Sequence, residues 1–258
     1  MPVFGGGHVN VDDVNVIWWR RISRSQSQLT DDPAHQDVIG NDSEAAVRGI
    51  LVSSFSGRWI DPPHLVTKAE NKLEQLRIAH QCGLRLPPTL VSQDPLAVRA
   101  FADKHNGDVI AKVLRGTSRR PLVTVSVDAD ALDDDSIRCC PTIYQARIPG
   151  DRHLRVNVFG SEIHAVEITS EHLDWRPYPD HPVHPVSLGS ELAARLLRVL
   201  GLLGLHMGVF DLKIDADGVP VWLELNPQGQ FLFLQAVCNV DLLGACSRFL
   251  ERVSTQPA

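Results

Sequence analysis

Apolar residues recur with helical spacing in several parts of the chain. The clearest case is TKAENKLEQLRIAHQCGLRLPPTLVS, residues 67–92, in which Leu73, Leu76 and Ala79 share one helical face and charged residues occupy the other. Gly83 is placed to end this helix, and the proline pair that follows forces an extended segment. The same spacing predicts further helices over 43–55, 94–105, 190–204 and about 241–253.

The N-terminal part of the chain combines a strand-like run with a long polar stretch. Residues 14–19, VNVIWW, have the β-branched and aromatic content of a strand. The polar stretch 22–43 predicts a loop, with Ser43 as the N-cap of the helix that follows. The DPP sequence at 61–63 then breaks the chain.

Apolar runs of strand length fill much of the remaining sequence. Residues 174–185 contain too many prolines for regular structure. Because helices and strands mix without a regular βαβ alternation, the expected fold class is α+β, or mixed α/β. The predicted strands lie within 108–114, 121–127, 142–148, 153–168 and 207–226.

The segment 207–226 has the pattern of a β-hairpin. The DG pair at 217–218 separates two strand-like runs and is typical of a two-residue turn of type I′. Counting outward from this turn pairs Asp211 with Glu224, and Asn226 shares their face because side chains repeat every second residue. The opposite face collects the apolar residues Phe210, Leu212, Ile214, Val221, Leu223 and Leu225.

The polar face of this hairpin sets two carboxylates against each other. Such a pair is repulsive unless a cation lies between its members. Asp211, Glu224 and Asn226 offer the oxygen ligands that Mg²⁺ prefers, and this ion completes its shell with water and substrate phosphates. The hairpin therefore predicts a magnesium site. The alternative is a solvated sheet face on which Lys213 pairs with an acidic neighbour.

Composition limits the classes of protein to consider. The 258 residues are 43% hydrophobic and 22% charged, as in a globular protein of one large or two modest domains. A formal charge of -6 argues against general nucleic-acid binding, which needs a basic surface. No apolar run reaches the ~18 residues of a membrane span and no signal-like start is present, so we expect a cytoplasmic protein without a membrane partner. The five cysteines lack the spacing of a disulfide framework or zinc site.

Several ordered motifs carry a resemblance to a known superfamily. The segments ENKLEQLRIAHQCGLRLPPTLVS, VIAKVLRG, IYQARIPGDRHLRVNVFG and GVFDLKIDADGVPVWLELNPQGQ resemble the ATP-grasp ligases, which join carboxylates to amines or hydroxyls. Within that superfamily, WWRR, WIDPP, DWR and LELNPQGQFLF look most like the maturases of ribosomal peptides that make microviridins and other graspetides. The likeness runs from about Ile17 to the C-terminus.

The resemblance implies an activity and a fold. ATP would phosphorylate a side-chain carboxylate of a precursor peptide, made of a leader and a core, and a hydroxyl or amine of the same peptide would displace the phosphate. The product would be a macrolactone or macrolactam. The expected organisation is a shortened N-terminal subdomain over 1–66 and an ATP-grasp domain over 67–258, divided into subdomains of about 67–143 and 144–258 that grip ATP between them.

The resemblance also implies roles for individual residues. Lys72 and Lys112 match lysines that contact nucleotide phosphates, and the loop that begins at Gly116 would fold over those phosphates. Gln145 and Ile148 lie where the hinge strand touches adenine. Arg155 matches an arginine placed near the phosphates and, with Lys112, is a candidate catalytic residue. The magnesium ligands match Asp211, Glu224 and Asn226, in agreement with the hairpin pattern.

Two further motifs have open interpretations. Asp174, Trp175 and Arg176 form the DWR element, whose role is to face the substrate or to order a loop. The WWRR element at 18–21 resembles an N-terminal motif of the maturases, but a buried Trp and a pairing Arg would give the same sequence.

The chain departs from the pattern of the maturases in two places. His153 replaces the aspartate of their DLRV element, and Asp151 is a candidate to compensate. The maturases also open with a strand, a helix and a strand before WWRR, whereas here that motif begins at residue 18. Most of the first subdomain is therefore expected to be missing, and an unpaired strand edge around 14–19 predicts a homodimer.

Three functions fit these observations. The first is the peptide crosslinking ligase. The second is an amino-acid ligase that adds residues to a protein or peptide, which uses the same nucleotide site. The third is a degenerate ATP-grasp domain that serves as a binding or regulatory subunit, which the short N-terminus and His153 would suit.

Overall fold

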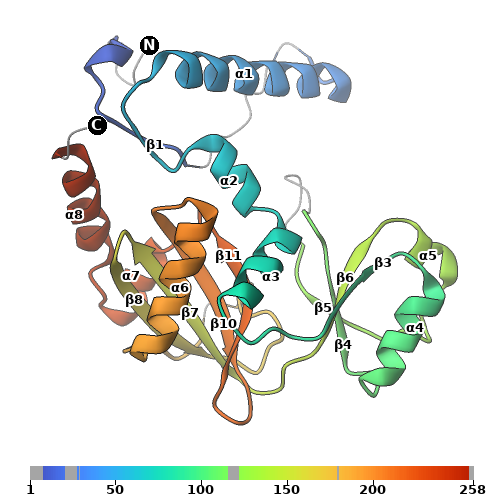
Figure 1. Ribbon diagram of the computed structural model, residues 1–258. Coiled ribbons are helices and arrows are strands. Elements are labelled where there is room, and N and C mark those ends of the chain that lie inside the picture. The colour runs from blue at the N-terminus through green and yellow to red at the C-terminus, as the bar shows by residue number, and fades with distance from the viewer. Residues whose placement is uncertain (1–7, 21–27, 29, 116–121, 179, 256–258) are drawn as a thin grey trace.

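The computed structural model describes residues 8–20, 28, 30–115, 122–178 and 180–255, and three β-sheets organise this part of the chain (Figure 1). Arg21 of the WWRR motif and the loop that begins at Gly116 lie outside the described residues. Helices and strands mix as the sequence predicts, so the α+β fold class is confirmed.

The smallest sheet contains β1 (Val16–Trp18) and β2 (Arg58–Ile60), which pair in parallel. The helix α1 (Pro33–Ser54) connects them and follows the 3-10 turn η1 (Val11–Asp13) and β1 in the chain. The strand predicted over 14–19 therefore has a partner along one edge. Within the described residues no further strand pairs with the other edge of β1.

The prediction of a loop over 22–43 is wrong for its second part. Helix α1 begins at Pro33 instead of after Ser43, and the Asp32 carboxylate accepts from the Ala34 amide at 2.8 Å. An aspartate N-cap followed by proline in the first turn is a strong helix start. The apolar pattern missed it because α1 buries little, with Gly40 and Leu51 as its buried residues.

The four-stranded sheet has the order β3-β6-β4-β5 with antiparallel pairing. Helices α4 (Pro95–Lys104) and α5 (Asp134–Arg138) cover it, and their apolar residues form a core of their own with Val109 and Tyr144 (Figure 1). The strands of this sheet are β3 (Thr89–Ser92), β4 (Val109–Lys112), β5 (Val125–Val127) and β6 (Thr142–Ala146).

The five-stranded sheet has the antiparallel order β11-β10-β7-β8-β9. Helix α6 (Ser190–Leu203) packs on one face, and α7 (Leu232–Cys238) with α8 (Leu242–Thr255) packs on the other. Both faces are therefore buried, as the continuous apolar runs of the sequence require. The strands are β7 (Arg152–Phe159), β8 (Glu162–Thr169), β9 (Val183–Val186), β10 (Met207–Ile214) and β11 (Pro220–Asn226).

Two further elements differ from the sequence prediction. Strand β9 lies partly inside the proline-rich segment 174–185, which was predicted to lack regular structure. Its Pro185 is tolerated because β9 is an edge strand, where a missing amide hydrogen costs no sheet bond. Helix α7 was not predicted, whereas α8 confirms the helix predicted over about 241–253.

The helix predicted within 67–92 forms as α3 (Lys72–Gln81), after the short helix α2 (Pro63–Ala69). Asn71 caps α3 by accepting from the amides of Leu73 and Glu74. The buried face differs slightly from the predicted one, because Leu73 is 46% exposed while Gln75 is 3% exposed. An amide therefore occupies an inward position on this helix.

The hairpin of β10 and β11 confirms the pairing of Asp211 with Glu224, although its turn and its register differ from the predicted ones. The strands are joined by a longer turn than two residues, since Ile214 pairs with Pro220, and the register then shifts between Asp211 and Leu212. This bulge adds a residue on β11 and cancels the error in the predicted turn.

The bulge also changes which side chains face the core. Trp222 pairs with Leu212 and joins the core between α6 and the sheet, whereas Leu223 lines a cavity on the opposite face. Val221 pairs with Lys213 and so lies on the side of that lysine. The prediction that Val221 and Leu223 face the core side with Phe210 is therefore wrong.

Candidate active site

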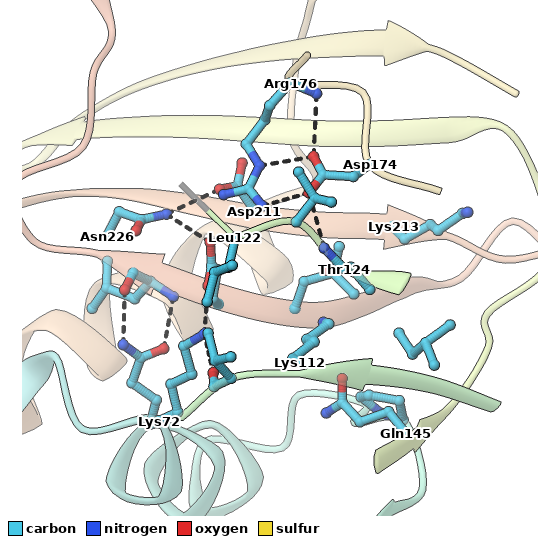
Figure 2. A pocket seen from close by; sticks show the side chains of 18 of the residues that line it. Lys72, Lys112, Leu122, Thr124, Gln145, Asp174, Arg176, Asp211, Lys213 and Asn226 are labelled. Carbon is cyan, nitrogen blue, oxygen red and sulfur yellow. Dashed lines mark hydrogen bonds and ion pairs between the residues drawn. The ribbon is translucent and has the colours of Figure 1, made fainter. Parts of the chain in front are cut away.

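A cavity of ≈ 550 Å³ lies between the four-stranded and the five-stranded sheet, next to the start of α3 (Figure 2). Strands β4 and β6 provide one wall, and β7, β10 and β11 provide the other. The predicted site residues that line it are Lys72, Lys112, Gln145, Ile148, Asp174, Arg176, Asp211, Glu224 and Asn226. Residues far apart in the sequence thus meet in one place.

Arg155 is the one predicted site residue that does not line this cavity. It lies behind Asp211, to which its Nη1 donates at 2.7 Å and 3.0 Å, and its Nη2 donates to the carbonyl of Gln230 at 2.8 Å. Its guanidinium also stands over the rings of Trp175 and Phe233. The arginine therefore holds one wall of the site together.

The carboxylates of the hairpin share an amide. Asn226 Nδ2 donates to Oδ2 of Asp211 at 3.1 Å and to Oε1 of Glu224 at 3.2 Å (Figure 2). Because strand pairing sets the two acids opposite each other, Asn226 and the neighbouring cations offset their repulsion.

The surroundings shift the pKa values of Asp211 and Glu224 in opposite directions. Burial raises the pKa of Asp211, and the charge of Glu224 adds to this, while Arg155 opposes it. Burial would also raise the pKa of Glu224, but the charge of Lys72, the hydrogen bond from Asn226 and further cations together outweigh that effect and lower its pKa. The site therefore keeps Glu224 ionised and makes Asp211 the easier of the two to protonate.

Lys72 and Lys112 reach the cavity from different elements. Lys72 Nζ lies 3.8 Å from Oε2 of Glu224 and donates to the carbonyl of Val113 at 3.0 Å. Lys112 ends β4 and points across the cavity (Figure 2). Burial lowers the pKa of Lys112 to about 8, although the charge of Glu224 opposes this. Both ammonium groups are placed to bind an anion.

The DWR element forms another edge of the cavity. Arg176 donates to both carboxylate oxygens of Asp174, at 2.8 Å and 2.5 Å, and Asp174 accepts from the Thr124 amide at 3.3 Å. The hydrogen bonds that Arg176 donates to Asp174 raise the pKa of Arg176 above its already high ordinary value. The element thus presents a permanent cation, and Asp174 orders the chain before β5.

Two further side chains, His153 and Lys213, line the cavity. His153 is 4% exposed, and burial lowers the pKa of its imidazole to about 4, so the ring is neutral at pH 7. Lys213 pairs with it across β7 and β10 and also lines the cavity. Lys213 makes no ion pair in the described part of the chain, so the solvated-face alternative finds no support. Asp151 is exposed and does not line the cavity.

Sequence analysis did not identify Gln75 as a site residue, although it lines the cavity. Its spacing from Lys72 was a usable signal, because residues three apart share a helical face. The WWRR motif has structural contacts instead. Trp19 is buried in the core, and Arg20 Nη2 donates to the Gly229 carbonyl at 2.8 Å.

No helix in the described residues is long and apolar enough to cross a membrane. The same residues contain no group of three or more His, Cys, Asp or Glu side chains that could hold a metal ion. The predicted magnesium ligands are two carboxylates and an amide, so their set does not depend on such a group.

Comparisons with known proteins give matches among solved structures alone. No model of a known protein family matches the chain, and no curated protein matches it. The macrocyclase MdnB from Microcystis aeruginosa MRC is 30% identical over 96% of this chain and 80% of its own, with a TM-score of 0.80. The macrocyclase MdnC from the same source, solved with its precursor peptide MdnA, is 27% identical over 99% of this chain and 82% of its own, with a TM-score of 0.84.

A third structure supports the fold alone. A RiPP-associated ATP-grasp ligase from Chryseobacterium gregarium, solved with ADP and a leader and core peptide, is 23% identical, with a TM-score of 0.82. The match covers 95% of this chain and 78% of that ligase.

Two sheets that close on a cavity of lysines and carboxylates, in a chain with these structural neighbours, define an ATP-dependent ligase with the ATP-grasp fold. The identity with MdnB extends over most of both chains and shows the family. The protein belongs to the ATP-grasp ligases that include the macrocyclases MdnB and MdnC.

Proposed function

We propose that this enzyme uses ATP and Mg²⁺ to crosslink side chains of a ribosomally made precursor peptide. The observation that carries the proposal is the convergence of Lys72, Lys112, Glu224 and Asp211 on one cavity, in a chain 30% identical to a macrocyclase. MdnC was solved with a precursor peptide, and the Chryseobacterium gregarium ligase with ADP, a leader and a core peptide.

The reaction we propose has two steps. A side-chain carboxylate of the peptide attacks the terminal phosphorus of ATP, and ADP leaves, so a poor electrophile becomes an acyl phosphate with a good leaving group. A hydroxyl or amine of the same peptide then attacks the acyl carbon, loses its proton and displaces phosphate. One water is lost from the peptide for each ester or amide formed. The enzyme contributes position and charge.

The chemistry of Asp211, Glu224 and Asn226 fits a magnesium ion. The Asn226 amide reaches both carboxylates, and a half-turn of that amide presents its oxygen in place of its nitrogen. The three side chains then offer oxygen ligands alone, as Mg²⁺ requires. PsnB, another ATP-grasp ligase of this fold, was solved with Mg and ADP. When bound, the ion would neutralise phosphate charge.

In this proposal the lysines bind the nucleotide phosphates, with Lys72 beside Glu224 and Lys112 on the opposite wall. Gln145 and Ile148 contact the base at the end of β6. Arg155 acts through Asp211, which it orients as one of the residues that would hold the metal. The buried, neutral His153 lines the same cavity.

Arg176 is the proposed contact for the peptide. It is half-exposed at the cavity edge in an ion pair with Asp174, which holds the guanidinium in one orientation for an incoming carboxylate. The proposed division of the chain remains an N-terminal subdomain over 1–66 and an ATP-grasp domain over 67–258, whose parts about 67–143 and 144–258 provide the two walls. The reaction consumes ATP and a newly synthesised ribosomal peptide, so we propose that the enzyme acts in the cytoplasm.

We also propose a homodimer. The second edge of β1 pairs with no strand in the described part of the chain, and α1 next to it exposes the apolar side chains of Val38, Ile50 and Val52. Unpaired edges and exposed apolar surface both favour association. Light scattering at micromolar concentration tests this, and a monomeric mass would contradict it.

Intact mass spectrometry tests the function. The probe is the peptide encoded by a small reading frame beside the gene, rich in Thr, Asp and Glu, incubated with enzyme, ATP and Mg²⁺. Loss of one water per bond supports crosslinking. A gain of one residue mass would assign the enzyme to the amino-acid ligases, and no mass change with no binding of ADP would assign it to a binding subunit.

A further inference from the structure

The side-chain amide of Gln75 is bonded to the strand that carries two of the proposed metal ligands. Its Oε1 accepts from the Leu225 amide at 2.8 Å, and its Nε2 donates to the Leu225 carbonyl at 2.8 Å. The same Nε2 donates to the carbonyl of Ala69 at the end of α2, at 2.6 Å. With 3% of its surface exposed, Gln75 makes these bonds away from bulk water.

Leu225 lies between Glu224 and Asn226 on β11, the edge strand of the five-stranded sheet. Side chains alternate along a strand, so Leu225 packs into the core while its two neighbours face the cavity. Its backbone groups point outward from the edge, where a further strand would bind them. The Gln75 amide takes the place of that strand for one residue and fixes the backbone between the two ligands.

The strand needs such a restraint because it is irregular at this point. The register shift between Asp211 and Leu212 leaves an extra residue on β11, and a bulge interrupts the ladder that would hold the edge. On the turn side of the bulge, the Trp222 amide donates to the Arg85 carbonyl at 2.8 Å. On the other side of the bulge, towards the proposed metal site, Gln75 supplies the hydrogen bonds to the outer edge of β11.

Helix α3 also supplies charge from the same face. Lys72 lies three residues before Gln75 and places its Nζ 3.8 Å from Glu224 and 3.0 Å from the Val113 carbonyl, which follows β4. One helix thus contacts both walls of the cavity and pins the edge strand. A displacement of α3 would move Glu224 and Lys72 together.

We propose that Gln75 is a positioning residue for the divalent cation, because its bonds to Leu225 set the separation of Glu224 and Asn226. The inference rests on the proposed function, since it concerns the same metal site. It assigns to Gln75 an indirect role in which the side chain touches neither metal nor substrate. A glutamine is suited to this role because one planar amide provides a donor and an acceptor to one residue.

The test is the Mg²⁺ concentration that gives half-maximal binding of ADP, measured by titration calorimetry on the full chain. Gln75→Met preserves volume and removes all three hydrogen bonds, and we expect it to raise this midpoint by about tenfold or more, as lost outer contacts to metal sites do. Gln75→Ala is the second variant. This variant serves if Gln75→Met does not fold, because the smaller side chain admits water from the cavity to the backbone of Leu225. We expect the Mg²⁺ midpoint to rise in this variant also.

Val199→Ala is the matched control. This residue of α6 is fully buried in the core behind the sheet and does not line the cavity, so its truncation destabilises the fold without altering the bonds of Leu225. We expect a lower melting temperature and an unchanged Mg²⁺ midpoint. A midpoint that shifts equally in Val199→Ala, or one that stays unchanged in both Gln75 variants, would overturn the inference.

The outcomes separate this inference from the function on which it rests. If the unsubstituted protein binds no ADP at any Mg²⁺ concentration, the proposed nucleotide site is wrong and the role of Gln75 is wrong with it. If the unsubstituted protein binds ADP in a Mg²⁺-dependent way and the Gln75 variants match it, the proposed function stands and the positioning role alone is rejected.

Discussion

Arg155 and Asp211 are paired directly across strands β7 and β10, and the guanidinium donates to both oxygens of the carboxylate. Both side chains are largely buried, at 7% and 14% exposure. The consequence is an ion pair built into the wall of the proposed metal site, so the stability of the fold and the charge of the site depend on the same contact.

Removal of one partner of this pair should destabilise the protein. We expect Arg155→Met to lower the free energy of unfolding by about 3–5 kcal/mol, because Asp211 is then buried without its cation. Adding Asp211→Asn to that variant should recover part of the loss. Urea unfolding of both single variants and the double variant measures the coupling between Arg155 and Asp211. If the two losses in free energy of unfolding simply add in the double variant, the coupling is refuted.

Loss of the Glu224 charge should disable the site and leave the fold intact. Glu224→Gln keeps the volume and the hydrogen bond with Asn226 but removes a ligand charge, so we expect Mg²⁺-dependent stabilisation by ADP to disappear from the melting temperature. Glu74→Gln is the control, because Glu74 lies on the same helix as Lys72 but pairs outward with Arg77. Full ligation activity in Glu224→Gln would overturn the magnesium assignment.

Lys112 should make nucleotide binding depend on pH. Its pKa is lowered to about 8, and a bound polyanion raises it again, so above pH 8 the free enzyme must take up a proton to bind. We expect ADP affinity to fall by up to about tenfold per pH unit above 8, and to remain flat in Lys112→Arg. Calorimetry of ADP binding at fixed Mg²⁺ between pH 7 and 9 measures this dependence. Equal pH profiles for the unsubstituted protein and Lys112→Arg would exclude Lys112 as the titrating group.

The same lysine has the opposite effect on the stability of the free protein. Its folded pKa lies below the unfolded value of about 10.4, so between these values the unfolded chain binds a proton that the folded chain does not. The contribution of Lys112 to stability therefore rises with pH across that interval. Lys112→Met should remove this rise from urea unfolding curves.

His206 should give a second pH dependence, far from the cavity. Its Nδ1 lies 2.8 Å from Oδ1 of the buried Asp61, which also accepts from the amides of His206 and Met207, and the hydrogen bond to Asp61 raises the pKa of His206. Because the folded pKa is raised, this stabilisation is complete below about pH 6.5 and is lost as pH rises through the folded pKa. His206→Gln should abolish that loss in melting curves, and an unchanged slope would contradict the assignment.

Local patterns predicted part of the site. Alternation along β10 and β11 with a two-residue turn predicted Asp211, Glu224 and Asn226 on one face, and they share that face in the structure because the bulge on β11 offsets the longer turn. Helical periodicity predicted α3, whereas the assignment of Lys72 to the site came from the resemblance to the ATP-grasp ligases. These predictions depend on local geometry, which a single sequence contains.

Contacts between distant segments could not be predicted in the same way. The burial of Lys213 depends on β7 and on the opposite sheet, so the hairpin alone suggested a solvated lysine. The bulge at Leu223 has no signal in its own residues, because Val221, Trp222 and Leu223 are all apolar and fit either face. Arg155 was expected at the phosphates, but its partner Asp211 holds it behind the cavity wall.

The register shift on β11 has a consequence for how this family of chains can vary. It separates the hairpin into a turn-side half, where Ile214 pairs with Pro220, and a site-side half, where Asp211 pairs with Glu224. The site-side half is held from outside by Gln75, independently of how the chain turns. We therefore expect a change in the length of the hairpin tip to leave the pairing of Asp211 with Glu224 in place.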